Sequence, residues 1–298
     1  MSVTKNSAGW RLSVAGLALG VSIFTVLWFA AAALGSKFGL WGWQFGLGTM
    51  VMQWGPWLTF FALGLSVIGL IVALIKSPRF QPALLALAAL LIAAMVFFRI
   101  AGFGAQAGAL PPIHDVQTDW SDPITFSESL ISQRKSDNAL NPVEDDPVIP
   151  ETANNRWPGM GGMRVAEAQE QAERERTVDG ETVPPAYDRP IEPVYFSQPP
   201  GEIARLALEL AEARGWDIFA RPETGEGVER TLIEATETST WFGFKDDVAI
   251  RIRAAEGATR VDMRSISRVG LSDLGMNARR VSSFLDELEA RGDGRRQP

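Results

Sequence analysis

The sequence predicts a membrane-anchored α+β protein, with three N-terminal transmembrane helices followed by a small antiparallel sheet packed by two helices. Two observations lead to this fold class. The first 102 residues hold six basic side chains, no acidic one and long apolar runs. After residue 190, apolar and charged side chains alternate with the period of half-buried strands, between two amphipathic helical segments.

Charge is spread unevenly over the 298 residues. Residues 103–199 hold seven basic and seventeen acidic side chains, and residues 200–298 hold fifteen and eighteen. The overall charge of −7 argues against nucleic acid as a partner, because phosphates require a basic surface. The sequence has no cysteine and one histidine, so it offers neither disulfides nor the ligands of a structural zinc site. We expect no cofactor and no bound metal.

Three segments are long and apolar enough to cross a membrane, which takes about 20 residues. They are residues 12–36, residues 57–75, and a third from Pro78 to about Arg99. A cleaved signal peptide is the alternative for the first segment, because basic residues precede it and small residues could form a cleavage site. Its apolar run exceeds a signal core and two further spans follow, so we expect it to be retained.

The connection between the first two spans, residues 35–56, is rich in tryptophan, whose ring favours the headgroup layer. We expect it to lie along the membrane surface. Gly16 and Gly20 in the first span form a GxxxG pair that allows close approach of another helix. Both features leave room for a membrane-protein partner.

Basic residues in short flanks orient membrane helices, because they stay in the cytoplasm. Only Lys37 lies between the first and second spans. Four others lie before the first span or between the second and third: Lys5, Arg11, Lys76 and Arg79. The N-terminus is therefore expected in the cytoplasm, and everything after residue 102 on the far side. In a Gram-negative cell this describes a multi-pass protein of the inner membrane with a periplasmic C-terminal module and the lipid bilayer as partner.

We divide the chain into four parts. Residues 1–102 form the three-helix transmembrane region, and residues 103–131 form a juxtamembrane segment that docks on the C-terminal module. Residues 132–190 are an acidic, proline-rich insert, and residues 191–298 are the α+β module. The insert has few branched apolar residues to offset the entropy of ordering, so we expect it to be largely disordered.

The module contains two predicted helices. One spans residues 200–214 and is closed by Gly215, and the last is capped by Ser272 or Asp273. The alternation of apolar and charged residues around 247–254 predicts that one sheet face meets the helices and the other is wet and charged. The expected strands lie at about 191–196, 216–221, 228–238, 247–254 and 259–266.

Four blocks in the C-terminal half occur in a characteristic order. They are IHDVQTDWSDPITF (113–126), GWDI (215–218), WFGFKDDVAIRIR (241–253) and VDMRSISRVGLSDLGMNARRV (261–281). Together they resemble domain-of-unknown-function family 1499, over nearly all of the chain after the third span apart from the insert. The resemblance implies a secreted, lipid-anchored or membrane-tethered envelope protein of bacteria, with relatives in plastids, and it implies no activity.

The segment RSISRVGLSDLGMNARR (264–280) is the main candidate ligand site. Guanidinium groups beside free N–H groups at a helix start suit a phosphate or carboxylate, such as an anionic lipid headgroup or a glycan acid. The alternative, which we favour, is that the segment fastens the last helix to the sheet, with Arg268 paired to Asp273 and Arg264 to Asp246 or Asp247. The candidate residues are Arg264, Ser265, Ser267, Arg268, Gly270, Asp273, Asn277, Arg279 and Arg280.

Two adjacent pairs invite a chemical role. Asp246 and Asp247 could hold a divalent cation, but neighbours in a strand point to opposite faces. His114 and Asp115 suggest a catalytic dyad with a nearby hydroxyl, Thr118 or Ser121. Sequence neighbours rarely form that geometry, and the chain has neither a GxSxG elbow nor a phosphate-binding glycine loop. A histidine hydrogen-bonded in a turn is the simpler interpretation.

The aromatic stretch Trp241–Phe244 is expected to pack at a sheet corner, and any exposed part of it would mark an interaction patch. We therefore expect a non-enzymatic, membrane-tethered module that binds an anionic ligand or a protein partner. The alternative is a hydrolase-like envelope enzyme using Asp246, Asp273 or His114. A pocket of convergent polar groups around the candidate arginines favours a ligand or enzyme site, whereas complete mutual pairing favours a scaffold.

Overall fold

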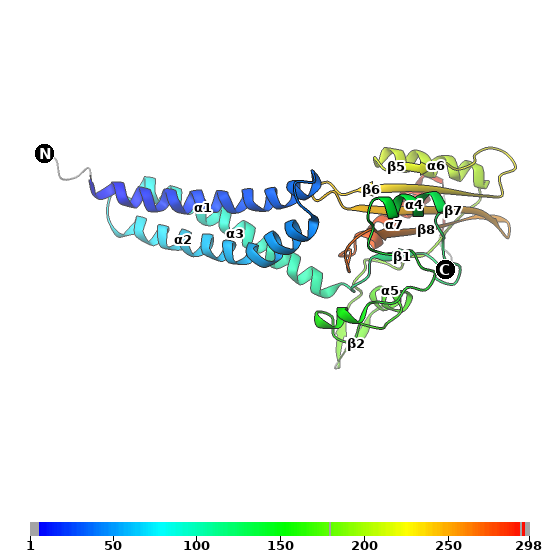
Figure 1. The fold of residues 1–298 in the computed structure, drawn as a ribbon, viewed down its shortest axis with the longest axis horizontal. Coiled ribbons are helices and arrows are strands. Elements are labelled where there is room, and N and C mark those ends of the chain that lie inside the picture. Colours follow the sequence, from blue (N-terminus) through cyan, green and yellow to red (C-terminus); the bar gives the residue numbers. More distant parts are fainter. Residues whose placement is uncertain (1–5, 179, 293, 296–298) are drawn as a thin grey trace. The chain divides into compact units, whose positions relative to one another are not determined.

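The computed structural model describes residues 6–178, 180–292, 294 and 295 (Figure 1). The chain divides into two compact units. One holds residues 1–106 with 240–243, and the other holds residues 107–239 with 244–298. Lys5, which contributed to the expected orientation, lies outside the described residues.

The first unit consists of α1 (Asn6–Lys37), η1 (Gln44–Trp54), α2 (Gly55–Ile75) and α3 (Phe80–Ala109). The three predicted apolar helices are present, and each is long and apolar enough to cross a membrane, as in a multi-pass membrane protein. The tryptophan-rich connection differs from its prediction. From Gln44 onward it is a π-helix that continues into α2, so the second helical segment is longer than the apolar run alone indicates.

Small and hydroxyl-bearing side chains lie where α1 contacts α2. The buried hydroxyls of Ser22 and Ser66 are 3.2 Å apart. A Cβ atom built at Gly69 would be 3.5 Å from the Cβ of Ala18, so the two backbones approach closely at this point. Gly16 and Gly20 meet no atom within 4 Å of such a Cβ, so the GxxxG pair is not used in this contact.

The second unit is built on an antiparallel sheet of order β1-β8-β7-β6-β5, with β4 also paired to β8. Because β1 pairs with residues 264–266 of β8 and β4 pairs with residues 259–261, these two short strands share one edge of β8. The bounds are β1 (Asp115–Gln117), β4 (Val194–Phe196), β5 (Asp217–Ala220), β6 (Arg230–Thr238), β7 (Lys245–Ala255) and β8 (Ala258–Ser267).

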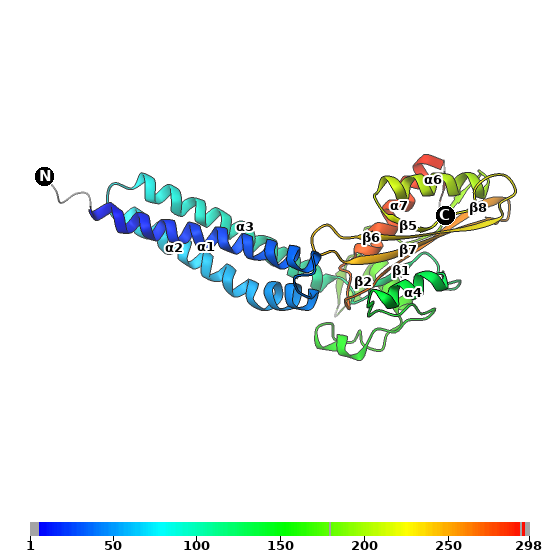
Figure 2. The same ribbon diagram turned by 45° about the horizontal axis from the view of Figure 1, so that its top comes forward.

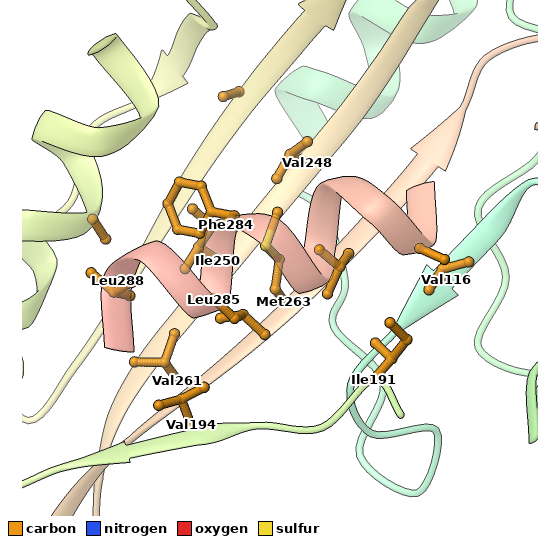
Figure 3. Packing of buried hydrophobic residues seen from close by; sticks show 14 of the residues in the cluster. Val116, Ile191, Val194, Val248, Ile250, Val261, Met263, Phe284, Leu285 and Leu288 are labelled. Carbon is orange, nitrogen blue, oxygen red and sulfur yellow. The ribbon is translucent and has the colours of Figure 1, made fainter. Parts of the chain in front are cut away.

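Two helices, α6 (Pro200–Ala213) and α7 (Met276–Gly292), cover one face of this sheet. The apolar stripe of α7 lies over the apolar residues of β7 and β8, as the periodicities predict (Figure 3). The ring of Phe284 also stacks on Trp216 with centroids 5.1 Å apart. The predicted fold class, three long apolar helices followed by an antiparallel sheet with flanking helices, is confirmed.

The other face of the sheet is not wet, contrary to the prediction. Arg251, Asp262 and Arg264 are 3%, 0% and 0% exposed. A layer formed by residues 118–144, including α4 (Glu128–Ser136), covers them on the side opposite α6 and α7 (Figure 2). In this layer Ile124, Phe126 and Leu130 pack on Ala249 and Ile266 of the sheet. The alternation located the charged face correctly, but strand periodicity carries no information about a second layer from upstream sequence.

The segment 132–190, expected to be largely disordered, folds onto the second unit. Besides the end of α4, it contains η2 (Glu151–Asn155), α5 (Val165–Glu173), β2 (Arg176–Val178) and β3 (Glu181–Val183). Average composition misled here, because widely spaced apolar residues that cannot form a core of their own can still join an existing one. The segment contributes Ile149, Ala153, Val165, Ala168, Ala172 and Tyr187 to the main core.

Gln169 attaches α5 to β1 in the way a neighbouring strand would. Its Oε1 accepts the backbone N–H of Gln117 at 3.2 Å, and its Nε2 donates to the Gln117 carbonyl at 3.0 Å. The same amide accepts the indole N–H of Trp120 at 2.9 Å and donates to the Glu173 carboxylate at 2.8 Å. Burial raises the pKa of Glu173 to about 7, against the lowering effect of the Gln169 hydrogen bond.

We predict that Glu173→Gln raises the melting temperature of the full chain in detergent at pH 8 and leaves it nearly unchanged at pH 4. The folded state binds the Glu173 proton more tightly than the unfolded state, whose pKa is near 4.5. Its stabilising contribution is therefore complete below pH 4.5 and is lost as the pH rises through about 7. The matched control is Glu170→Gln on the exposed side of α5. Identical pH profiles for wild type and Glu173→Gln would contradict this assignment.

Candidate functional site

The candidate segment 264–280 is divided between the two faces of the sheet, because successive residues of β8 point in opposite directions. Arg264 lies on the face covered by α4, whereas Ser265 and Ser267 face α7. Arg268 follows β8 directly, and its side chain reaches the carboxylate of Asp247 on the α4 side. The segment therefore takes part in polar clusters on both faces of the sheet.

Arg264 joins β8 to β1 and to the covering layer. Its Nε and Nη2 donate to the two oxygens of Asp115 at 3.0 and 2.6 Å, a bidentate pair in which both side chains are at most 1% exposed. The guanidinium also donates to the carbonyl oxygens of Ile124 and Glu144, at 2.7 and 2.6 Å. All three nitrogens of the guanidinium therefore donate to protein oxygens.

Asp247 is the centre of a second buried ion cluster on this face. Its carboxylate is 0% exposed and accepts from Arg268 at 2.8 and 2.7 Å, from Thr236 at 2.7 Å, and from Arg134 of α4. Arg268 also pairs with Asp137, just past the end of α4. Two guanidinium groups thus neutralise a carboxylate that would otherwise be buried at high cost.

Asn277 and Arg280 connect the first turns of α7 to β7 and β8. Asn277 accepts from the Ser265 hydroxyl at 2.7 Å and donates to the Ser267 hydroxyl at 3.0 Å. Arg280 donates to Asp246 at 2.6 Å and to Ser265 at 3.0 Å, and it also pairs with Glu237. This cluster fastens the closing helix to the strand ends.

The ion pairs differ from those expected. Arg268 pairs with Asp247 instead of Asp273, and Arg264 pairs with Asp115 instead of Asp246 or Asp247. Asp273 caps α7, accepting from the backbone N–H groups of Gly275 and Asn277 at 2.8 and 2.7 Å. Desolvation raises the pKa of Asp273 to about 6. As predicted from the strand period, Asp246 and Asp247 point to opposite faces.

Sequence reasoning missed the partners that come from upstream of residue 191. Arg134 and Asp137 lie in the segment 132–190, for which disorder was expected, and Asp115 of β1 was considered only as a neighbour of His114. The available signal was on α4, where Leu130 and Arg134 are four residues apart and therefore share the buried face. A helix with one apolar and one basic residue on its buried face can pack on a sheet face that carries both apolar and acidic side chains.

His114 and Asp115 make structural contacts and are not arranged as a catalytic dyad. Burial lowers the pKa of His114, and its carbonyl accepts from Ser267 N–H and Asn277 Nδ2 at 2.8 and 2.9 Å. The hydroxyls considered as nucleophiles bind acidic side chains elsewhere: Thr118 donates to Asp262 and Ser121 to Asp119. These groups hold β1 and the covering layer in place.

A groove of about 590 Å³ runs along the solvent side of α7, beside the C-terminal end of α6 and the end of β6. Of the candidate residues, Arg279 and Arg280 reach it. Arg279 donates to the carbonyl of Leu274 at 3.1 Å, and within the described residues it contacts no carboxylate. The full lining is Asp188, Arg189, Arg214, Trp216, Glu237, Met276, Arg279, Arg280, Ser282, Ser283 and Asp286.

We predict that Arg268→Ala lowers the free energy of unfolding of the full chain in detergent by about 3 kcal/mol or more, because it leaves the buried Asp247 with one cation fewer. Arg205→Ala on α6 is the control, since that arginine is 53% exposed in an i,i+4 pair and its loss should cost about 0.5 kcal/mol or less. Urea titration measures both. If both variants lost the same free energy of unfolding, the Asp247 cluster would contribute no more to stability than an exposed ion pair.

Comparison with known proteins matches the part of the chain that contains the sheet to one family. Among curated proteins and among solved structures, no match to this chain is found. The family described as "Protein of unknown function (DUF1499)" matches residues 115–288. That span begins at Asp115, the first residue of β1, and ends within α7, so it contains the sheet, α4, α6, most of α7 and the ion pairs of Arg264, Arg268 and Arg280. The chain therefore belongs to the DUF1499 family of proteins of unknown function.

Proposed function

We propose that this protein is a membrane-tethered binding module of the bacterial inner membrane, with its folded unit in the periplasm and its ligand site in the groove along α7. Three candidate membrane spans support the tether. The greater number of basic residues on the flanks assigned to the cytoplasm supports the orientation. The observation that carries the binding role is that Arg279 lines a cavity without a carboxylate partner among the described residues.

Binding fits the geometry better than catalysis does. Two of the three side chains considered for an enzyme have structural roles, because Asp246 holds Arg280 and Asp273 caps α7. At His114 it is the backbone carbonyl that binds β8 and α7. Catalytic groups need a substrate within hydrogen-bond reach in a cavity. None of these three residues is part of the lining of the α7 groove.

The groove suits an anionic group attached to an apolar body. Arg214 and Arg189 also line it, and they pair with the carboxylates of Glu287 and Asp286 respectively. Trp216 and Met276 supply apolar surface beside these cations. A guanidinium that lacks a carboxylate partner favours a phosphate or carboxylate ligand, because charge-assisted hydrogen bonds are the strong polar contacts.

We predict that native mass spectrometry of the full chain, released from detergent micelles, shows a bound anionic species in the wild type that Arg279→Glu loses. Replacing one charge-assisted contact by a repulsive charge should reduce occupancy about tenfold or more. Arg205→Glu makes the same charge change on the exposed side of α6 and should keep the species. A wild-type spectrum without bound species, or equal occupancy in both variants, would refute the groove as the ligand site.

The orientation has its own test. A phosphatase reporter fused to the C-terminus should be active in intact cells, because such enzymes mature only in the periplasm, and a green fluorescent reporter at the same position should be dark. The expected result follows from three crossings that start with a cytoplasmic N-terminus. A fluorescent fusion together with an inactive phosphatase would reverse the orientation.

A further inference from the structure

A second cavity, of about 240 Å³, lies among the segments that the family domain adds around the sheet. Its walls come from residues 108–111, from the turn after η2, from α5 and from the start of β2. Every lining residue belongs to the second unit. The cavity shares no lining residue with the α7 groove, so the two are separate candidate sites.

Hydrogen bonds and core packing fix the walls of this cavity. The indole N–H of Trp157 donates to the Leu110 carbonyl at 3.0 Å and joins the turn after η2 to residues 108–111. The N–H of Ala186 donates to the Ala172 carbonyl at 2.8 Å and joins the segment after β3 to α5. Ala168 and Ala172 of α5 are part of the main core. The cavity is therefore formed before any ligand binds, as is usual for small-molecule sites.

The charged side chains of this lining are both cationic. They are Arg156 and Arg176, and among the described residues the lining includes no aspartate or glutamate. The lining of the α7 groove, in contrast, includes three acidic side chains beside its four arginines. Within the described part of the chain, neither Arg156 nor Arg176 forms a salt bridge with a carboxylate. The cavity therefore carries positive charge that no acidic side chain of its lining offsets.

Both guanidinium groups keep N–H donors for a ligand. Nη1 of Arg176 donates to Oε1 of Gln171 at 3.2 Å, but its buried Nε has no acceptor among the residues that the structure describes. A buried N–H without an acceptor costs free energy that a bound anion would recover. The guanidinium carbon of Arg156 lies 4.9 Å from the centre of the Trp157 ring, a cation–π contact that supplies no acceptor oxygen.

We propose that this cavity binds a phosphate group through Arg156 and Arg176, in addition to any ligand of the α7 groove. Two guanidinium groups without an acid match a phosphate monoester, which carries a charge of about −1.5 to −2 at neutral pH, better than they match a single carboxylate. The cavity is smaller than the roughly 300–1,000 Å³ of pockets for drug-sized ligands, so it suits one small group. Inorganic phosphate and a phospholipid headgroup share this chemistry.

Isothermal titration calorimetry of the full chain in a non-ionic detergent tests the site. One titrant is inorganic phosphate and the other is dihexanoyl phosphatidic acid, each corrected for its heat of mixing with protein-free micelles. Arg156→Glu should weaken binding about tenfold or more, because a repulsive carboxylate replaces a charge-assisted contact. The matched control is Arg174→Glu, which makes the same charge change two residues from Arg176, on an exposed side chain outside the lining. It should keep the affinity of the wild type.

The two titrants separate the sources of the phosphate. Binding of inorganic phosphate that Arg156→Glu weakens assigns the cavity to free phosphate, whereas binding of phosphatidic acid alone, weakened by the same variant, assigns it to a lipid headgroup. The proposal is overturned if neither titrant binds, or if Arg156→Glu and Arg174→Glu bind equally well. It is also overturned if Arg279→Glu abolishes binding while Arg156→Glu retains it, because the phosphate then occupies the α7 groove. Arg176→Gln is the second variant, should Arg156→Glu fail to fold.

Discussion

The second unit depends on the neutralisation of a charged sheet face that is buried. Asp247, Asp262 and Arg264 are fully buried in the middle of β7 and β8, and an unpaired charge there costs several kcal/mol. Each is paired, Asp247 with arginines on two sides and Arg264 with Asp115 in a bidentate contact. Most of these counter-charges come from the strands or their ends, and the covering layer adds Arg134 of α4.

The charges of the sheet and those of the covering layer therefore fix the position of the layer on the sheet. If residues 118–144 were displaced, Asp247 would lose Arg134 and Arg251 would lose Asp122, so the layer cannot slide by one residue without loss of these ion pairs. An apolar second layer would tolerate such shifts far better, because hydrophobic contacts are non-directional. The family match begins at Asp115, so these partners lie inside the shared domain.

The sequence predicts local structure well and long-range partners poorly. Apolar run length found α1, α2 and α3, and the two periodicities found β6, β7, β8 and α7, since these signals lie within one element. The covering layer left only a weak signal, the four-residue spacing of Leu130 and Arg134, because the rest of α4 is mostly polar. The expected salt bridges failed for the same reason: Arg264 lies 149 residues from Asp115, and nothing in either local pattern links them.

The same pairing decides where function can reside. Most polar side chains of the candidate segment bind the helices and strands to one another. A ligand must therefore bind side chains that extend outside these polar clusters. Arg280 does both: Asp246 and Ser265 fix its guanidinium on the inner side, while its outer side lines the α7 groove. Nearby carboxylates raise its pKa against the effect of burial, which keeps it charged. A cation already fixed in this way loses little conformational freedom on binding, whereas its exposed neighbour Arg279 must be ordered by the ligand itself.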